Sequence, residues 1–560
     1  MVELPGDNSL QRTFNTEAAT ILKGTNRLFR RDLLPVIPWD GRLREMKPAE
    51  FISWHQEYFV GYKTKISKDG DKFDVVKDMT ETMARNLLQA SDFVSKLPQI
   101  HRLYPSPVPV INEADSLVLC TPGYDPSTGT YVFEGQIQAT PPPNGKTNLT
   151  GPVGSDDYFD DTMTLPEAFW TLHDLHQYFP FSDWSELIYP EPTDPLYRID
   201  PEDGNTVPYR KSRSLAVQIG AMLALFAANC VPREASKMGF IYNASAPRSG
   251  KSLLAKIATA PVYGSFKAQP WREDEESMIK ILDSEVLAAS PYICFDNIRG
   301  LLASQPLEGF MTSPTWTGRY LGRTEMFTAE NNAVLMFTGN NINAGTDISH
   351  RALFCDLFVE QADIQDREMD PEKVINDVFL SKPQNRRLIL SALWSIVRHW
   401  DFAGRPLASG KVRLGFEDHG RIIGGMVEFA GFGDMLARPI LENAGDSEAE
   451  DIITLVKKLH ALNRPDYTFQ EIVHVCWEHG LFPWYLHGKE ELHSIREGFP
   501  AELTLRLNDS CNAKMGLLIA RHSGERGHVH QFRDDAGTII RVRFTLRGKG
   551  RHRRFHLIKF

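Results

Sequence analysis

Cysteine is scarce in this chain, with six in 560 residues. No two cysteines have the CxxC spacing of a zinc or redox site, and no pair of histidines lies beside them. This pattern argues against a disulfide framework and against a structural zinc site. We therefore expect reduced thiols in the core, at positions 120, 230, 294, 355, 476 and 511.

Long hydrophobic runs are missing as well. The longest apolar stretch, Leu215 to Cys230, contains Gln218 and fits a buried helix better than a membrane span. The first residues, MVELPGDNSLQR, have neither a signal-peptide nor a lipidation pattern. We therefore expect no membrane partner and a cytoplasmic location.

A large excess of positive charge is also absent, because 62 Lys and Arg face 72 Asp and Glu, for a net charge of −10. The balance argues against a uniformly basic surface for nucleic acid. Residues 514–560 differ from the rest, because Lys, Arg and His are frequent there and the only acids are Glu525, Asp534 and Asp535. The C-terminal region is therefore the candidate for a basic interface.

Apolar residues alternate within that basic region, which a solvated tail would not require. Helical patterns over 467–479, 490–497 and 503–522 precede two strand patterns that flank the turn 547–553. This order predicts a winged-helix domain whose basic turn contacts DNA phosphates. A winged helix that binds protein remains the alternative. The expected phosphate contacts are Arg547, Lys549, Arg551 and Arg553.

The most informative segment is 238–252, which reads MGFIYNASAPRSGKS. An apolar strand, a small-residue loop and the start of a helix follow one another, as in a P-loop. Such a loop binds phosphates with backbone N–H groups and the helix dipole, although Ser245 stands where the first glycine is usual. We expect Lys251 to reach the β and γ phosphates and Ser252 to hold Mg²⁺. The phosphate-binding residues are Ser245, Ala246, Pro247, Arg248, Ser249, Gly250, Lys251 and Ser252.

Two further apolar runs end in polar residues at the spacing that such a site needs. Residues 291–297 end in Asp296 and Asn297, and residues 333–341 end in Asn340 and Asn341. A strand that carries Asp296 to the side of Ser252 would complete a Mg²⁺ site. An amide at position 340 would orient the attacking water or detect the γ-phosphate. Each run alone is compatible with an ordinary buried strand.

The shared order of these motifs resembles the AAA+ helicase modules of superfamily 3 and of the poxvirus-D5 and phage-P4 type. These modules occur in primase-helicases of phages, plasmids and integrative elements. The resemblance implies that Arg351 is an arginine finger that acts on the ATP of a neighbouring subunit, and that Arg319 and Arg323 face the DNA channel. An arginine paired or solvated on the surface is the alternative for Arg351. Other matching segments are 26–31, 84–88, 122–131, 179–181, 271–280 and 415–431.

One position departs from that family. Many such motors have a second acid after the metal aspartate, whereas this chain has Asn297. An amide can position a water molecule but cannot accept its proton. Glu276, in the acidic run 273–276, is a candidate base, and a solvated helix start is an equally good interpretation of that run. Slow turnover, or ATP used as a switch, therefore stays open.

These observations predict a multi-domain α/β protein. The expected parts are a mainly helical domain (1–104), a β-hairpin and loop-rich region (105–211), a P-loop AAA+ ATPase core (212–362), a helical lid (363–450) and a winged-helix domain (451–560).

The expected function is that of an ATP- and Mg²⁺-dependent DNA helicase or translocase of a phage or mobile element. We expect it to act on single-stranded or forked DNA as a homo-oligomer, specifically a hexameric ring. The alternatives are a nucleotide-gated DNA-binding or loading protein and an ATPase of a defence system.

Overall fold

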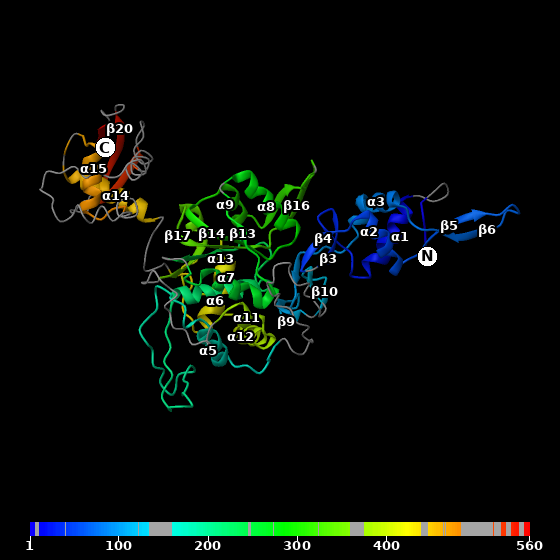
Figure 1. The fold of residues 1–560 in the computed structure, drawn as a ribbon, viewed down its shortest axis with the longest axis horizontal. Coiled ribbons are helices and arrows are strands. Elements are labelled where there is room, and N and C mark those ends of the chain that lie inside the picture. Colours follow the sequence, from blue (N-terminus) through cyan, green and yellow to red (C-terminus); the bar gives the residue numbers. More distant parts are fainter. Residues whose placement is uncertain are drawn as a thin grey trace. The chain divides into compact units, whose positions relative to one another are not determined.

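The chain divides into two compact units, Met1–Arg438 and Pro439–Phe560 (Figure 1). The predicted boundary between residues 450 and 451 lies after this division, within helix α14 (Asp446–Ala461). The computed structural model describes residues 1–5, 11–39, 41–120, 122–133, 159–244, 248–272, 274–322, 324–358, 375–437, 446–462, 464, 466–482, 519, 528–533, 539–547 and 554–559.

The N-terminal part of the first unit combines helices with small sheets. Its helices are α1 (Gln11–Lys23), α2 (Pro48–Trp54), the 3₁₀ turn η1 (His55–Glu57), α3 (Glu81–Gln89) and α4 (Ser91–Val94). Its strands are β1 (Val2–Glu3), β2 (Phe29–Arg31), β3 (Leu34–Trp39), β4 (Arg42–Glu45), β5 (Gly61–Ile66) and β6 (Lys72–Val76). They form two three-stranded sheets, β1-β5-β6 and β2-β3-β4. The expectation of a mainly helical domain missed these sheets, because most of their strands are short or partly exposed. β3 is apolar but contains Pro35 and Pro38, and proline within an apolar run argues against a strand.

The next region consists of short strands, as its turn-rich composition predicts. The strands are β7 (Arg102–Tyr104), β8 (Val108–Ile111), β9 (Leu117–Cys120), β10 (Gly123–Asp125) and β11 (Thr130–Val132). β8 pairs antiparallel with β9, and β10 pairs antiparallel with β11, which runs parallel to β7. Helix α5 (Leu165–His176) follows and begins with a capping box in which Thr164 and Glu167 bond each other's backbone N–H.

A five-stranded parallel sheet forms the centre of the first unit. Its strands are β12 (Gly239–Ala244), β13 (Gln269–Pro270), β14 (Tyr292–Leu302), β17 (Val334–Ala344) and β18 (Ala352–Leu357), and their order across the sheet is β13-β14-β17-β12-β18. Every neighbouring pair is parallel. Continuous apolar runs suit strands that are covered on both faces, which explains why these segments were recognisable in the sequence.

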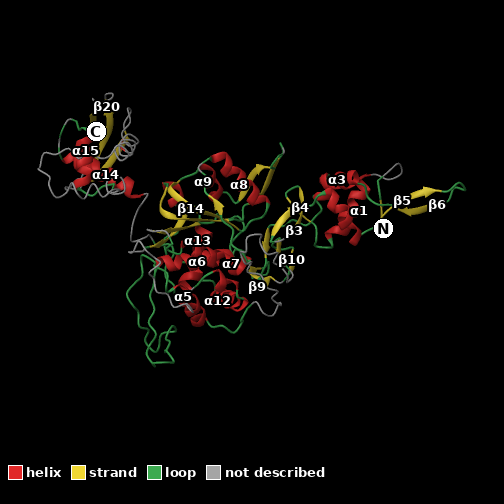
Figure 2. Ribbon diagram, in the orientation of Figure 1, coloured by secondary structure: helices red, strands yellow, loops and turns green. Residues whose placement is uncertain are grey.

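Helices cover both faces of this sheet (Figures 1 and 2). On one side lie α8 (Glu275–Leu287) and α9 (Gln305–Thr312). On the other lie α6 (Arg213–Phe226) and α7 (Lys251–Tyr263), and beyond them α11 (Asp377–Ser381) and α12 (Pro383–Phe402). α13 (Glu417–Phe429) packs against α6 and α12. α6 is buried along nearly its whole length, so the longest apolar stretch of the chain is a core helix. One continuous apolar core joins the sheet to these helices.

A two-stranded hairpin precedes the β17 strand. It pairs β15 (Thr315–Arg319) with β16 (Met326–Glu330) in antiparallel register, from Thr315 opposite Glu330 to Arg319 opposite Met326. Asp283 of α8 fixes its base, because its carboxylate accepts from the indole N–H of Trp316 at 2.7 Å and from the backbone N–H of Arg319 at 3.0 Å. The hairpin is therefore attached to α8 rather than to the central sheet.

The second unit has its own apolar core. Its described elements are α14, α15 (Phe469–Glu478), β19 (His528–Arg533), β20 (Ile539–Arg547) and β21 (Arg554–Lys559), and the three strands form an antiparallel sheet in chain order. α15 and the two predicted strands are present, whereas β19 was not anticipated. The predicted helices over 490–497 and 503–522 lie outside the described residues apart from Ile519, so the winged-helix prediction stays a prediction.

Two expectations from the composition can be compared with the described residues. Five cysteines, at positions 120, 230, 294, 355 and 476, are buried and form no disulfide, as expected, and Cys511 lies outside the described residues. Among the described helices, none is both long enough and apolar enough to cross a bilayer.

Candidate functional site

The carboxyl end of β12 lies beside the middle of β17 and near the bulge of β14, two strands that continue past this point to Ala344 and Leu302. In the pairing of β12 with β17, Ala244 lies opposite Asn340, and in the pairing of β14 with β17, Ile298 lies opposite Gly339. β12 lies between β17 and β18, while β13, the next strand in the chain, lies at the far edge of the sheet. The connection from β12 leads toward that far edge, whereas the connection from its neighbour β17 leads the other way, to β18. Open parallel sheets bind their ligands where neighbouring connections diverge in this way.

The loop after β12 leads directly into helix α7. Residues 245–247 lie outside the described residues, and the described part of the loop begins at Arg248. Arg248 and Gly250 both have left-handed backbone, with φ of 60° and 99°. When left-handed residues alternate with others along a loop, successive backbone N–H groups point to the same side and can bind an anion. Gly250 is the N-cap of α7, so the positive end of the helix dipole lies at the same point.

Glycine is required at position 250 for two reasons. A Cβ atom there would lie 2.9 Å from Cε1 of Phe179, a ring that is itself buried. The φ of 99° is also unfavourable for any residue with a side chain. Close approach of the loop to the Phe179 ring thus holds the backbone in its curved form.

A hydrogen-bonded group connects the loop to the second strand. Ser252 Oγ donates to Asp296 Oδ1 at 3.0 Å, and the hydroxyl of Thr338 donates to the same oxygen. The backbone N–H of Asn297 donates to Thr338 Oγ1 at 3.4 Å. Asp296 and Asn297 lie in a β-bulge between Phe295 and Ile298, and Asn297 has a φ of 60°. The bulge directs Asp296 toward Ser252, a common use of bulges beside functional sites.

Lys251 lies in the same place and is 9% exposed. Burial lowers the pKa of its amine from the usual value, and the carboxylate of Asp296 opposes that shift. Lys251 therefore lies within the electrostatic reach of Asp296. Its cost of desolvation would be offset further by an anionic ligand.

Two buried polar atoms at this edge lack hydrogen-bond partners among the described residues. They are Oγ of Ser249 and Oδ1 of Asn340. Orphaned buried polar atoms are rare and call for a ligand or a water molecule.

These residues fit Mg²⁺ and a triphosphate. Mg²⁺ is usually bound by one or two carboxylates together with phosphate oxygens and water, and Ser252 with Asp296 supplies the protein part of such a set. Among the described residues, no cluster of three His, Cys, Asp or Glu side chains forms an all-protein metal site.

A neighbouring polar network at the same edge was not predicted from the sequence. Arg213, at the start of α6, donates to Asp356 Oδ2 at 3.0 Å and lies 3.5 Å from the carboxylate of Asp183. The side-chain amide of Asn243 donates to Asp356 Oδ1 at 3.3 Å. These four residues fasten α6 and the segment before it to the ends of β12 and β18. Thr338 was also missed, since a threonine inside an apolar run gives no sign of its partner.

Arg351 lies at the opposite edge of the sheet. It immediately precedes β18, and its backbone carbonyl accepts from the N–H of Gly239 at the start of β12. Its guanidinium donates to the carbonyl of Glu308 at 2.6 Å and lies 3.6 Å from Asp347. The six residues of β18 span about 20 Å at ~3.3 Å per residue, so Arg351 is far from the Lys251 site of its own chain.

Glu276 lies in the first turn of α8, whose N-cap is Asp274. Its carboxylate pairs with Lys280 at 2.7 Å, and both side chains are exposed. No described contact joins Glu276 to Asp296 or Asn297. The geometry is that of a solvated helix start, which was one of the two interpretations of this acidic run.

Of the predicted DNA-binding residues, Arg319 and Arg547 are described. Arg319 ends β15 and its side chain is exposed, and Arg547 ends β20, where only its backbone is described. Arg323, Lys549, Arg551 and Arg553 lie outside the described residues. Positions 319 and 323 belong to the β15–β16 hairpin and its turn, and positions 547–553 to the end of β20 and the turn before β21.

Comparisons with known proteins add little. No family model matches the chain, and no curated protein does. Among solved structures, the apo A form of the C-terminal region of NrS-1, residues 305–718, aligns over 74% of this chain and 81% of that chain, with 9% identity and a TM-score of 0.29. A similarity of this size carries no conclusion about function, which must be argued from the site itself.

Proposed function

We propose that this protein is a Mg²⁺-dependent ATPase that moves along or unwinds DNA as a homo-oligomeric ring. The observation that carries the proposal is the hydrogen bond between Ser252 and Asp296 beside the buried Lys251. A lysine, a hydroxyl and a carboxylate converge at a helix N-terminus whose preceding loop has left-handed backbone. This combination is the one that P-loop NTPases use for Mg²⁺ and a triphosphate.

Each residue has a separate part in binding. Backbone N–H groups of the loop ending at Gly250 would hold the β-phosphate, and Lys251 would neutralise the β and γ oxygens. Ser252 and Asp296 would hold Mg²⁺, whose charge stabilises the developing negative charge of phosphoryl transfer. The unpartnered Oδ1 of Asn340 is available to accept from the attacking water.

Hydrolysis by a single chain should be slow. Asn297 cannot accept a proton, and the carboxylate of Glu276 is exposed and paired with Lys280. Arg351 lies on the opposite edge from Lys251, so it could complete a site only in a neighbouring copy. We therefore propose that assembly switches on hydrolysis, since a finger supplied in trans neutralises charge that is otherwise unpaired.

DNA contact is assigned to two basic hairpins. One is β15–β16 with Arg319 and Arg323, and the other is β20–β21 with the basic turn 547–553. Arginines and lysines on ribbon turns suit sequence-independent contacts with phosphates.

Asn297 favours a second candidate function, in which ATP binding gates DNA binding with little turnover. The two candidates differ in steady-state ATP hydrolysis measured with and without single-stranded DNA. Turnover that DNA stimulates and that Lys251→Ala abolishes supports the motor. Tight ATP binding without turnover in the assembled protein supports the switch. Absence of Mg²⁺-dependent ATP binding would overturn both.

A further inference from the structure

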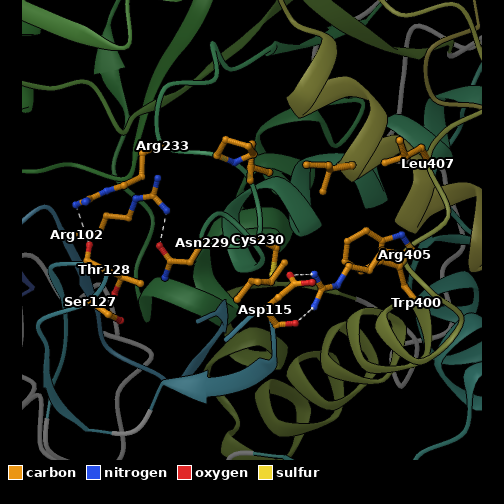
Figure 3. A pocket seen from close by; sticks show the side chains of 14 residues that line it. Arg102, Asp115, Ser127, Thr128, Asn229, Cys230, Arg233, Trp400, Arg405 and Leu407 are labelled. Atoms are coloured by element: carbon orange, nitrogen blue, oxygen red, sulfur yellow. Dashed lines mark hydrogen bonds and ion pairs between the residues drawn. The ribbon is translucent and has the colours of Figure 1, made fainter. Parts of the chain in front are cut away.

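A cavity of about 460 Å³ lies in the first unit, and its lining residues are different from those of the site described above (Figure 3). Its lining residues come from β7, the end of β8 and the turn after it, the turn before β11, the segment after α6, the end of α12 with the loop that follows, and α13. Its volume is within the range of small-molecule sites in proteins. None of its lining residues belongs to the proposed ATPase machinery.

One wall of the cavity consists of hydrogen-bond donors. Arg102 is 6% exposed and donates through Nε to Asn332 Oδ1 at 3.1 Å and through Nη1 to the carbonyl of Ala228 at 2.9 Å. Nη1 also donates to Oδ1 of Asn229. The second guanidinium nitrogen, Nη2 of Arg102, is buried without a partner among the described residues, and so is the amide nitrogen of Asn229. Both are unused donors, and a buried donor left unpaired is costly.

Charge at this wall is only partly compensated. Arg233 lines the cavity beside Arg102, donates to the carbonyl of Thr128 at 2.9 Å and lies 3.5 Å from the carboxylate of Glu330. Glu330 also pairs with Nδ1 of His101 at 2.9 Å, and no carboxylate among the described residues pairs with Arg102. The other arginine of the cavity, Arg405, is already paired with Asp115 and Asp401. Figure 3 shows the Arg405–Asp115 pair apart from the Arg102–Asn229 contact.

Apolar side chains complete the lining, among them Ile111, Val231 and Leu407. A ligand that fits both the wall of hydrogen-bond donors and the apolar lining needs an anionic head rich in acceptors and an apolar or planar body. Guanidinium groups bind carboxylates and phosphates in this way, with charge-assisted hydrogen bonds.

We propose that this cavity binds a small organic anion. Its carboxylate or phosphate monoester accepts from Arg102, Asn229 and Arg233, and its body packs on the apolar wall. The proposal does not depend on the ATPase site, because it involves none of that site's residues.

The test is isothermal titration calorimetry of the full chain with phenyl phosphate, benzoate, inorganic phosphate and deoxyadenosine 5′-monophosphate. Phenyl phosphate and benzoate separate a phosphate head from a carboxylate head, and inorganic phosphate shows what the head alone contributes. We expect saturable binding of at least one of the organic anions, weakened about tenfold or more by Arg233→Gln, since one charge-assisted contact is worth about that factor. Lys251→Ala should leave the affinity within about twofold, because it alters only the other site.

A second variant keeps the test decisive if Arg233→Gln fails to fold. Leu407 is 54% exposed, so Leu407→Trp should be tolerated and should fill the apolar end of the cavity. It should weaken phenyl phosphate while leaving inorganic phosphate unchanged. The proposal is overturned if no organic anion binds more tightly than about 1 mM, if Lys251→Ala abolishes the binding, or if neither Arg233→Gln nor Leu407→Trp changes it.

Discussion

Replacement of Gly250 by alanine tests whether the loop before α7 needs its curved backbone. The new methyl group would meet Phe179 Cε1 at 2.9 Å and would stand on a residue whose φ is 99°. Left-handed backbone costs a side-chain-bearing residue about 1–2 kcal/mol, and an overpacked buried contact adds about 1–3 kcal/mol. The loop can relieve this strain of at least about 2 kcal/mol only by leaving its curved form. ATP affinity should then fall about thirtyfold or more.

Gly433→Ala is the matched control. Gly433 has a φ of 96°, but a Cβ atom there would have no neighbour within 4 Å, and the residue lies outside the site. This variant should lose about 1–2 kcal/mol of stability and keep its ATP affinity.

The assay is equilibrium binding of a fluorescent ATP analogue together with thermal unfolding. Combining Gly250→Ala with Phe179→Leu should recover part of the lost affinity, because the smaller side chain removes the clash. If Gly250→Ala binds ATP like the unmodified protein, or if both glycine variants lose affinity equally, the argument from the Phe179 contact fails.

Three further predictions follow from the same structure. Asp296→Asn should abolish the Mg²⁺-dependent part of nucleotide affinity and leave binding in excess EDTA within about threefold; an equal loss with and without Mg²⁺ would remove Asp296 from the metal site. Arg351→Ala should bind ATP normally but hydrolyse it about a thousandfold more slowly or worse, since a finger is worth about 10³–10⁵ in kcat, and mixing it with Lys251→Ala should restore turnover; no recovery would refute action in trans. His419 is buried with no hydrogen-bond partner among the described residues, and burial lowers its pKa to about 3, so it should favour unfolding as pH falls from about 6.5 to 3. Urea unfolding of His419→Phe should show a shallower loss of stability over that range, and an unchanged slope would contradict the assignment.

The central sheet could be predicted because its strands are buried on both faces. Runs such as 291–295 and 333–337 are apolar throughout, so their position was visible without knowledge of their partners. The polar residue at the end of each run also marked the edge where the site lies. β13 was not visible, because two residues, Gln269 and Pro270, carry no periodic pattern.

The sequence did not predict which side chains contact each other. The Thr338 hydroxyl and the Asp296 carboxylate are 42 residues apart, and Arg213 and Asp356 are 143 apart. Such pairs depend on the order of strands across the sheet, which local patterns do not encode. The N-terminal sheets were missed for a different reason, since strands such as β5 and β6 are short and largely exposed and carry three lysines between them.

The most direct measurement is an experimental structure of the full chain with Mg²⁺ and a non-hydrolysable ATP analogue. We expect the triphosphate at the N-terminus of α7, the amine of Lys251 on its β and γ oxygens, and the metal between Ser252 and Asp296. We also expect Asn340 Oδ1 to gain a hydrogen-bond partner. Nucleotide bound elsewhere, or a triphosphate contacted by neither Lys251 nor a metal on Ser252, would contradict this expectation.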